Sequence, residues 1–158
     1  MPAPKNPAPL GPGDPVPPFS LLDQDGVVVR PEDFLGSHLF IFFYPKANTG
    51  GCTAQAVSVQ EALERLSGLN VRVVGISPDS PTTQKRFAEK HGLRFPLLSD
   101  SDHLVAEAFG VWGEKQVRGK TVQGIIRSAF LFDSNGKLVQ AWSPVSPKDT
   151  VPKLLEAL

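Results

Sequence analysis

Residues 39–52 read LFIFFYPKANTGGC, and this stretch decides the fold. The apolar run Leu39–Tyr44 predicts a buried strand in the middle of a sheet, because both of its faces are hydrophobic. The residues from Thr53 to about Leu66 predict a helix, and Gly68 follows as a stop signal. The sequence therefore places Cys52 where a central strand passes into a helix.

Cys52 is the single cysteine of the chain. At the start of a helix, a thiol meets unpaired backbone N–H groups and the positive end of the helix dipole. That environment favours the thiolate, which is the nucleophilic form. Because the sequence holds no second cysteine, the chemistry of this thiol cannot end in a disulfide within the chain.

Strands and helices alternate along the rest of the chain, and a hairpin precedes the last helix. Ser80 and Gly92 are the expected ends of one helix, and Ser101 and Asp102 are expected to cap another that ends near Gly110. The pattern predicts an α/β fold with a mixed sheet. The further elements expected are a hairpin over Phe19–Val29, a strand over Val71–Ser77, a helix over Pro81–His91, a strand over Phe95–Ser99, a hairpin of Ile125–Phe132 with Lys137–Trp142, and a helix over Pro147–Leu158.

Composition limits the classes of function. The chain has 158 residues, of which 41% are hydrophobic, which suits one domain with a real core. Its 16 basic and 16 acidic residues balance, and no basic block stands out, so nucleic-acid or membrane-surface binding has little support. Apolar runs are far shorter than the ~20 residues that span a bilayer. A single cysteine suits a reducing compartment, and we expect a cytoplasmic protein.

The first residues are rich in proline and have no apolar centre, unlike a secretory signal. We expect a flexible leader over residues 1–10 and one domain over residues 11–158.

The residues around the thiol suggest its substrate. A lone cysteine is more often an inert buried side chain. Here Gly50 and Gly51 leave backbone N–H groups unshielded, and Thr49 adds a hydroxyl, so a small polar pocket is expected. Such a pocket suits the O–O bond of a peroxide, which a thiolate attacks to form sulfenic acid. Fixed donors would stabilise the charge that develops, and an arginine would serve best.

Pro45-x-x-x-Thr49-x-x-Cys52 resembles the active-site motif of the peroxiredoxins. Residues 43–53 look like the branch of the bacterioferritin comigratory proteins, or PrxQ. The resemblance covers about residues 11–158 and includes Gly13–Leu21, Val73–Asp79 and Gly124–Asp133. It implies a thioredoxin-like fold, in which helices flank a central mixed sheet and a hairpin lies at the N-terminus. It also implies a peroxidase that acts on hydrogen peroxide and organic hydroperoxides.

The resemblance assigns four residues. Cys52 would be the peroxidatic nucleophile, and Thr49 would hydrogen-bond the peroxide. Arg127 would hold the thiolate and orient the substrate, and Pro45 would shield the sulfur from water. Alone, Arg127 would be interpreted as a surface ion-pair residue, but its place in an apolar run, expected to be a strand, argues against this.

The chain departs from the family pattern at three positions. Ala47 and Gly50 stand where relatives often have Asp and Pro, and neither position supplies a catalytic atom. Val57 stands where many relatives have a resolving cysteine. The resemblance therefore implies a one-cysteine enzyme whose sulfenic acid reacts with an outside thiol. Thioredoxin, glutaredoxin and low-molecular-weight thiols all remain open. Relatives are often monomers, and we expect a monomer.

Several alternatives stay open at this point. A redox sensor or holdase would use the oxidised Cys52 without efficient turnover. Gln55 would either help to bind substrate or be a solvated residue of the first helical turn. The two tryptophans, Trp112 and Trp142, are expected to pack rather than bind substrate. The three histidines are scattered, and neither a metal site nor a cofactor is expected.

Overall fold

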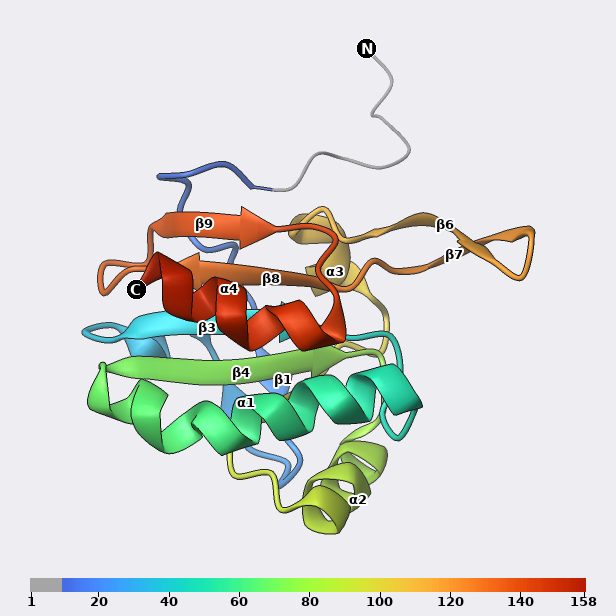
Figure 1. The fold of residues 1–158 in the computed structure, drawn as a ribbon, viewed down its shortest axis with the longest axis horizontal. Helices are drawn as coiled ribbons and strands as arrows, with labels where there is room; N and C mark the ends of the chain where they lie inside the picture. The colour runs from blue at the N-terminus through green and yellow to red at the C-terminus, as the bar shows by residue number, and fades with distance from the viewer. Residues whose placement is uncertain (1–9) are drawn as a thin grey trace.

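A computed structural model describes residues 10–158, apart from the side chain of Val117. A mixed sheet runs through the molecule and helices cover it (Figure 1). Its strand order is β2-β1-β5-β4-β3-β8-β9. These strands are β1 (Leu21–Leu22), β2 (Val28–Val29), β3 (His38–Phe43), β4 (Val71–Ser77), β5 (Leu97–Ser99), β8 (Ser128–Phe132) and β9 (Leu138–Trp142). The helices are α1 (Gly50–Gly68), α2 (Pro81–His91), α3 (Leu104–Ala108) and α4 (Thr150–Ala157).

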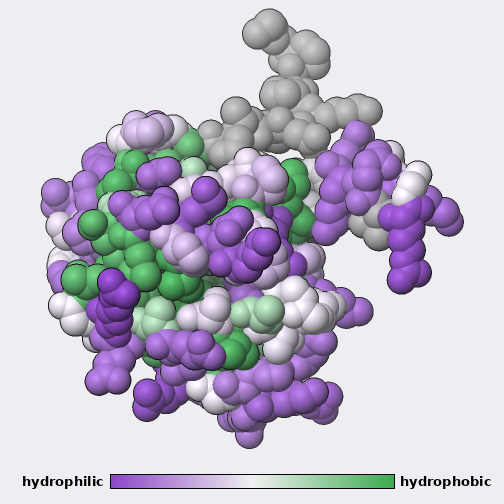
Figure 2. Space-filling view, in the orientation of Figure 1, coloured by the Kyte–Doolittle hydropathy of each residue, from purple (hydrophilic) through white to green (hydrophobic). Residues whose placement is uncertain are grey.

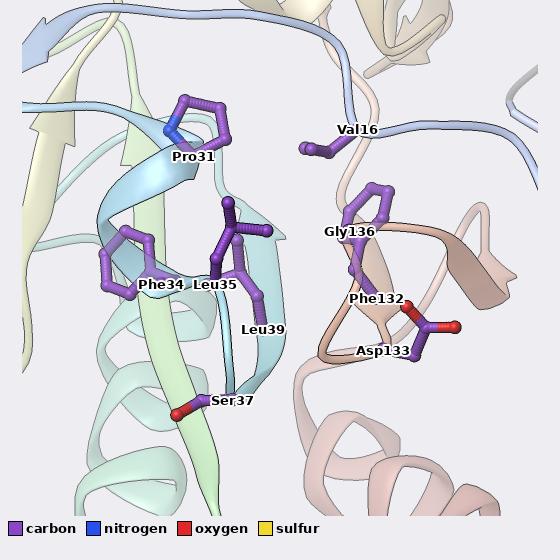
Figure 3. A pocket seen from close by; sticks show the side chains of 9 residues that line it. All are labelled: Val16, Pro31, Phe34, Leu35, Ser37, Leu39, Phe132, Asp133 and Gly136. Atoms are coloured by element: carbon purple, nitrogen blue, oxygen red, sulfur yellow. The ribbon is translucent and has the colours of Figure 1, made fainter.

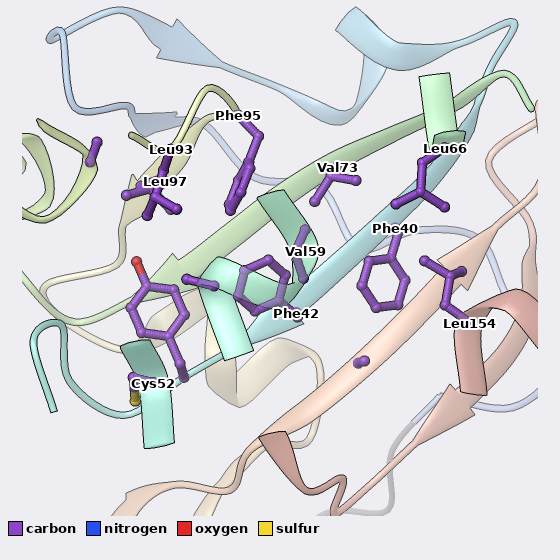
Figure 4. Close-up of a cluster of buried hydrophobic side chains, with 14 of the residues drawn as sticks. Phe40, Phe42, Cys52, Val59, Leu66, Val73, Leu93, Phe95, Leu97 and Leu154 are labelled. Atoms are coloured by element: carbon purple, nitrogen blue, oxygen red, sulfur yellow. The ribbon is translucent and has the colours of Figure 1, made fainter. Parts of the chain in front are cut away.

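Strand β3 lies at the centre, parallel to β4 and antiparallel to β8. Its side chains alternate between two hydrophobic cores, as a pleated strand requires. Phe40 and Phe42 enter the core that α1, α2 and α4 cover (Figure 4), whereas Ile41 and Phe43 enter the core beneath α3. Both faces of the strand are thus buried, which confirms the predicted central strand.

The β3–α1–β4 unit places the start of α1 at the carboxyl end of β3, between two parallel strands. Helix α1 begins at Gly50, three residues before the predicted start, so Cys52 lies within its first turn. Gly75 of β4 makes room for the rings of Phe42 and Tyr44, because a methyl group at this position would lie 3.0 Å from the Phe42 ring and 3.1 Å from the Tyr44 ring.

The predicted N-terminal hairpin, strand β4 and helix α2 are confirmed. Ser101 and Asp102 were predicted to cap α3; Asp102 does accept one bond there, but Asp100 accepts two. The carboxylate of Asp100 accepts hydrogen bonds from the backbone N–H groups of Val105 (3.2 Å) and Ala106 (2.8 Å). Asp102 accepts one from Leu104 (3.2 Å), and His103 is the N-cap residue.

The predicted hairpin before the last helix is present as β8 and β9, but another hairpin, between α3 and β8, was not predicted. Strands β6 (Trp112–Val117) and β7 (Lys120–Ile125) form a two-stranded ribbon that projects from the body of the molecule (Figure 1). The run 125–132, predicted as one strand, is therefore divided between β7 and β8, and Arg127 lies between these strands. Hydrophilic residues cover most of the ribbon (Figure 2), so its sequence shows little alternation of apolar and polar residues.

The predicted leader lies outside the described residues except for Leu10, which packs against the core beneath α3. Among residues 10–158, no helix has both the length and the apolar character needed to cross a bilayer.

Candidate active site

The loop from Pro45 to Thr49 joins β3 to α1 and is tied to the end of β4. The backbone N–H of Ala47 donates to the carboxylate of Asp79 (2.7 Å), and the hydroxyl of Ser77 donates to the same oxygen (2.7 Å). Asn48 takes a left-handed backbone conformation (φ 63°), which asparagine tolerates better than most residues. These contacts fix where α1 begins.

Cys52 is completely buried in the first turn of α1. The neighbouring glycine lets other side chains approach this turn. A methyl group on Gly51 would lie 3.1 Å from Nη2 of Arg127 and 3.4 Å from Cγ of Pro147. A larger residue here would make Arg127 shift by a few tenths of an ångström, so the guanidinium of Arg127 lies close against the turn that holds the thiol.

Arg127 is held from two sides. Its Nη1 donates to Oε1 of Gln55 (2.8 Å), and its backbone carbonyl accepts from Val145 (2.9 Å). Gln55 is buried, and its Nε2 donates to the hydroxyl of Thr150 (2.9 Å). The interpretation of Gln55 as a solvated residue is therefore wrong. The helical spacing between Cys52 and Gln55, three positions, is the signal that places both on one face.

The other two predicted site residues lie at the edge of the same region. Thr49 is exposed and is the N-cap residue of α1, and its hydroxyl donates to the carbonyl of Lys46 (2.8 Å). Pro45 is half-buried and lines a cavity of about 400 Å³. The remaining residues around this cavity are Glu114, Lys115, Ile125, Ile126, Arg127 and Pro144.

Lys115 is a residue of this region that the sequence analysis did not single out. Burial and the nearby charge of Arg127 lower the pKa of Lys115, while the negative charge of Cys52 raises it. Lys115 is thus close enough to Arg127 and Cys52 to interact electrostatically with both. The sequence did not predict the strand that carries Lys115, so it did not predict that Lys115 lines the cavity.

A buried hydrogen-bond chain supports the loop from below. The phenol of Tyr44 donates to Oε1 of Gln84 (2.5 Å), and Nε2 of Gln84 donates to Ser77 (2.8 Å). Burial is the largest cause that raises the pKa of Tyr44, and the charges of Asp79 and Cys52 add to it. The phenol therefore stays protonated and keeps its role as a donor.

A pocket of about 450 Å³ between α1 and α4 is lined by none of the four predicted site residues. A second pocket, beside the turn that joins β8 to β9 (Figure 3), holds only about 10 Å³ and lies among Leu35, Phe132 and Asp133. That volume is no larger than one water-sized probe. Within residues 10–158, no cluster of three His, Cys, Asp or Glu side chains is arranged to hold a metal ion. Trp112 stacks on His103 (3.8 Å between centroids), and Trp142 packs against Phe40 (6.4 Å), as predicted.

The mixed sheet carries one buried thiol at the start of a helix, and an arginine lies against the same helical turn. This arrangement defines a thiol-based oxidoreductase of thioredoxin-like fold. Residues 12–141 match the AhpC/TSA family, and the chain belongs to this family of peroxiredoxins.

The relatives agree over most of their length. The chain is 52% identical to peroxiredoxin Bcp of Escherichia coli strain K12, over 82% of this chain and 83% of that one. A mutant of PrxQ from Xylella fastidiosa superposes with a TM-score of 0.88 at 30% identity, over 94% of this chain and 95% of that one. The bacterioferritin comigratory protein of Xanthomonas campestris, which is described as having alkyl peroxide reduction activity, matches with a TM-score of 0.83 at 34% identity, over 88% of each chain.

Proposed function

We propose that Cys52 is the peroxidatic residue of a thiol-dependent peroxidase that reduces hydrogen peroxide and organic hydroperoxides. The observation that carries the proposal is the contact of Arg127 with the first turn of α1, where Cys52 is buried. The alternative role as a sensor or holdase is not favoured, because the relatives are named peroxiredoxins.

In the first step, the sulfur of Cys52 attacks one oxygen of the hydroperoxide and the O–O bond breaks. The sulfur loses two electrons and becomes sulfenic acid, and the other oxygen leaves as hydroxide or alkoxide and takes up a proton. Arg127 and the backbone N–H groups of the helix start stabilise the negative charge that spreads over the oxygens. Thr49 hydrogen-bonds the peroxide, and Pro45 forms the wall that keeps water from the sulfur.

In the second step, an external thiol attacks the sulfenic acid, and water leaves as a mixed disulfide forms. A second thiol then attacks this disulfide and restores the thiol of Cys52. Val57 takes the position of a resolving cysteine, so the second thiol must come from another molecule. Because Cys52 is completely buried, the first turn of α1 must move before a protein thiol can reach it.

We further propose that the reductant is thioredoxin, glutaredoxin or a low-molecular-weight thiol, that the enzyme works as a monomer, and that it acts in the reducing cytoplasm. Support for the compartment comes from the single cysteine.

The test is peroxide consumption by the protein and by Cys52→Ser, with each of the three reductants in turn. Multiple turnovers are expected with at least one reductant, and none with Cys52→Ser. Mass spectrometry of the oxidised protein should show sulfenic acid or a mixed disulfide on Cys52. A single stoichiometric burst with every reductant would contradict the proposal.

A further inference from the structure

Lys115 lines the same cavity as Pro45 and Arg127. Lys115 belongs to the hairpin of β6 and β7, which projects from the body of the molecule (Figure 1). Ile125, Ile126 and Pro144 form the apolar part of the lining. The cavity thus combines apolar walls with two cationic side chains, whereas the reacting atoms of a hydroperoxide need only one.

The hairpin gives Lys115 a defined position. Its Nζ donates to the backbone carbonyl of Ile125 (3.0 Å), on the opposite strand. On the way the side chain passes over Gly124, where a methyl group would lie 2.9 Å from Cε of Lys115. Gly124 is not among the glycines with positive φ, so its backbone conformation does not require glycine. We attribute the glycine to the room that the lysine needs.

The ammonium group has capacity for a ligand. It carries three N–H donors, and the bond to Ile125 uses one of them. Lys115 is partly buried and lies near the charge of Arg127, so an anionic partner would relieve both costs. Glu114 also lines the cavity, so the lining is not purely cationic.

We propose that Lys115 is a specificity-determining residue, which binds an anionic substituent of an organic hydroperoxide while Ile125, Ile126 and Pro144 contact its alkyl part. This inference rests on the proposed function, and Arg127 keeps its place at the O–O bond. The substrate class is a hydroperoxide that has an apolar body and a carboxylate or similar anion at its far end.

The test compares three substrates by the second-order rate of Cys52 oxidation: tert-butyl hydroperoxide, a tertiary alkyl hydroperoxide with a terminal carboxylate, and the methyl ester of the latter. The unmodified protein should oxidise faster with the carboxylate than with the ester, and added salt should reduce this preference. Lys115→Met should lower the carboxylate-to-ester ratio about tenfold, which matches a lost hydrogen bond between charged groups. Lys115→Arg should keep most of the preference.

Gly124→Ala is a second variant, which retains the charge but displaces the lysine side chain, and it should lower the same ratio. Lys120→Met is the matched control, because it removes an exposed charge from the same hairpin, and it should leave the ratio unchanged. Equal effects of Lys115→Met on both substrates, or no effect, would overturn the inference while the proposed function stood. Failure of the unmodified protein to react with any of the three peroxides would overturn the inference, and failure with hydrogen peroxide as well would overturn the proposed function.

Discussion

Arg127 reaches the first turn of α1 although it lies 72 residues beyond Gln55, the side chain that accepts its hydrogen bond. The motif around Cys52 could be predicted from sequence because its residues are neighbours along the chain. The Gln55–Arg127 contact could not, because it depends on how α1 and the segment before β8 meet. Gly51 is part of the same arrangement, because the absence of a side chain at this position leaves space for the guanidinium of Arg127.

Arg127→Ala should slow the oxidation of Cys52 by hydrogen peroxide about a hundredfold, because a fixed donor to the developing negative charge is lost. Arg127→Lys should recover part of the rate, since lysine restores the charge but not the forked geometry. The measurement is the rate of sulfenic acid formation in a single turnover. Arg86→Ala, which removes an exposed arginine from α2, is the control and should not change the rate. An unchanged rate in Arg127→Ala would show that the assigned role is wrong.

At the scale of the elements, strong periodic patterns gave reliable predictions and polar ribbons did not. Helix α2 has a serine cap, a first-turn proline and a glycine stop, and its bounds were predicted correctly. Hairpin β6–β7 joins its strands through Arg118 and Gly119, both with positive φ, which is the geometry of a tight turn. That dipeptide was the available signal, but the exposed strands on either side have no hydrophobic face to support it.

Asp100→Ala should destabilise the protein by about 2 kcal/mol, because two buried N–H groups at the start of α3 lose their acceptor. Asp102→Ala should cost about 0.5 kcal/mol, because Asp102 is exposed and accepts a single bond of 3.2 Å. Urea unfolding of both variants measures the difference. Equal losses would mean that the predicted cap at Asp102 does as much as the one observed at Asp100.

The same carboxylate predicts a pH effect. Burial raises the pKa of Asp100, and the bonds from Ala106 and Val105 offset only part of this rise. The folded state therefore binds the proton more tightly than the unfolded state, whose Asp100 has a pKa near 3.8. The contribution of this group to the free energy of unfolding is largest below that value and is lost as pH rises through the folded pKa. Urea midpoints across this range should show the decline in the unmodified protein, and Asp100→Asn should remove that component.

At the scale of the whole molecule, the one-cysteine cycle can be changed by a single substitution. A cysteine at position 57 would lie five residues beyond Cys52, about 7.5 Å along the axis of an intact helix. A disulfide does not span residues so placed unless the backbone moves. Val57→Cys should therefore form an intramolecular disulfide after one equivalent of peroxide only if the first turns of α1 unwind.

We expect that disulfide to form, because the helix start must open for any external thiol to reach Cys52. Thiol counting and mass spectrometry under non-reducing conditions detect it. Glu64→Cys, which places an exposed thiol further along the same helix, is the control and should give intermolecular products only. Exclusively intermolecular products from Val57→Cys as well would show that the start of α1 is too rigid to open this far.

Because Cys52 is the single cysteine, it also determines how many catalytic cycles each molecule completes before it is inactivated. After one peroxide the sulfur holds two oxidising equivalents that it cannot pass to its own chain. Reaction with a thiol next leads to regeneration of the enzyme. Reaction with a second peroxide instead converts the sulfenic acid to sulfinic acid and inactivates the enzyme. In every cycle, the reaction of the sulfenic acid with a thiol competes with its reaction with a second peroxide. The number of turnovers that one molecule completes therefore follows the ratio of thiol to peroxide around it.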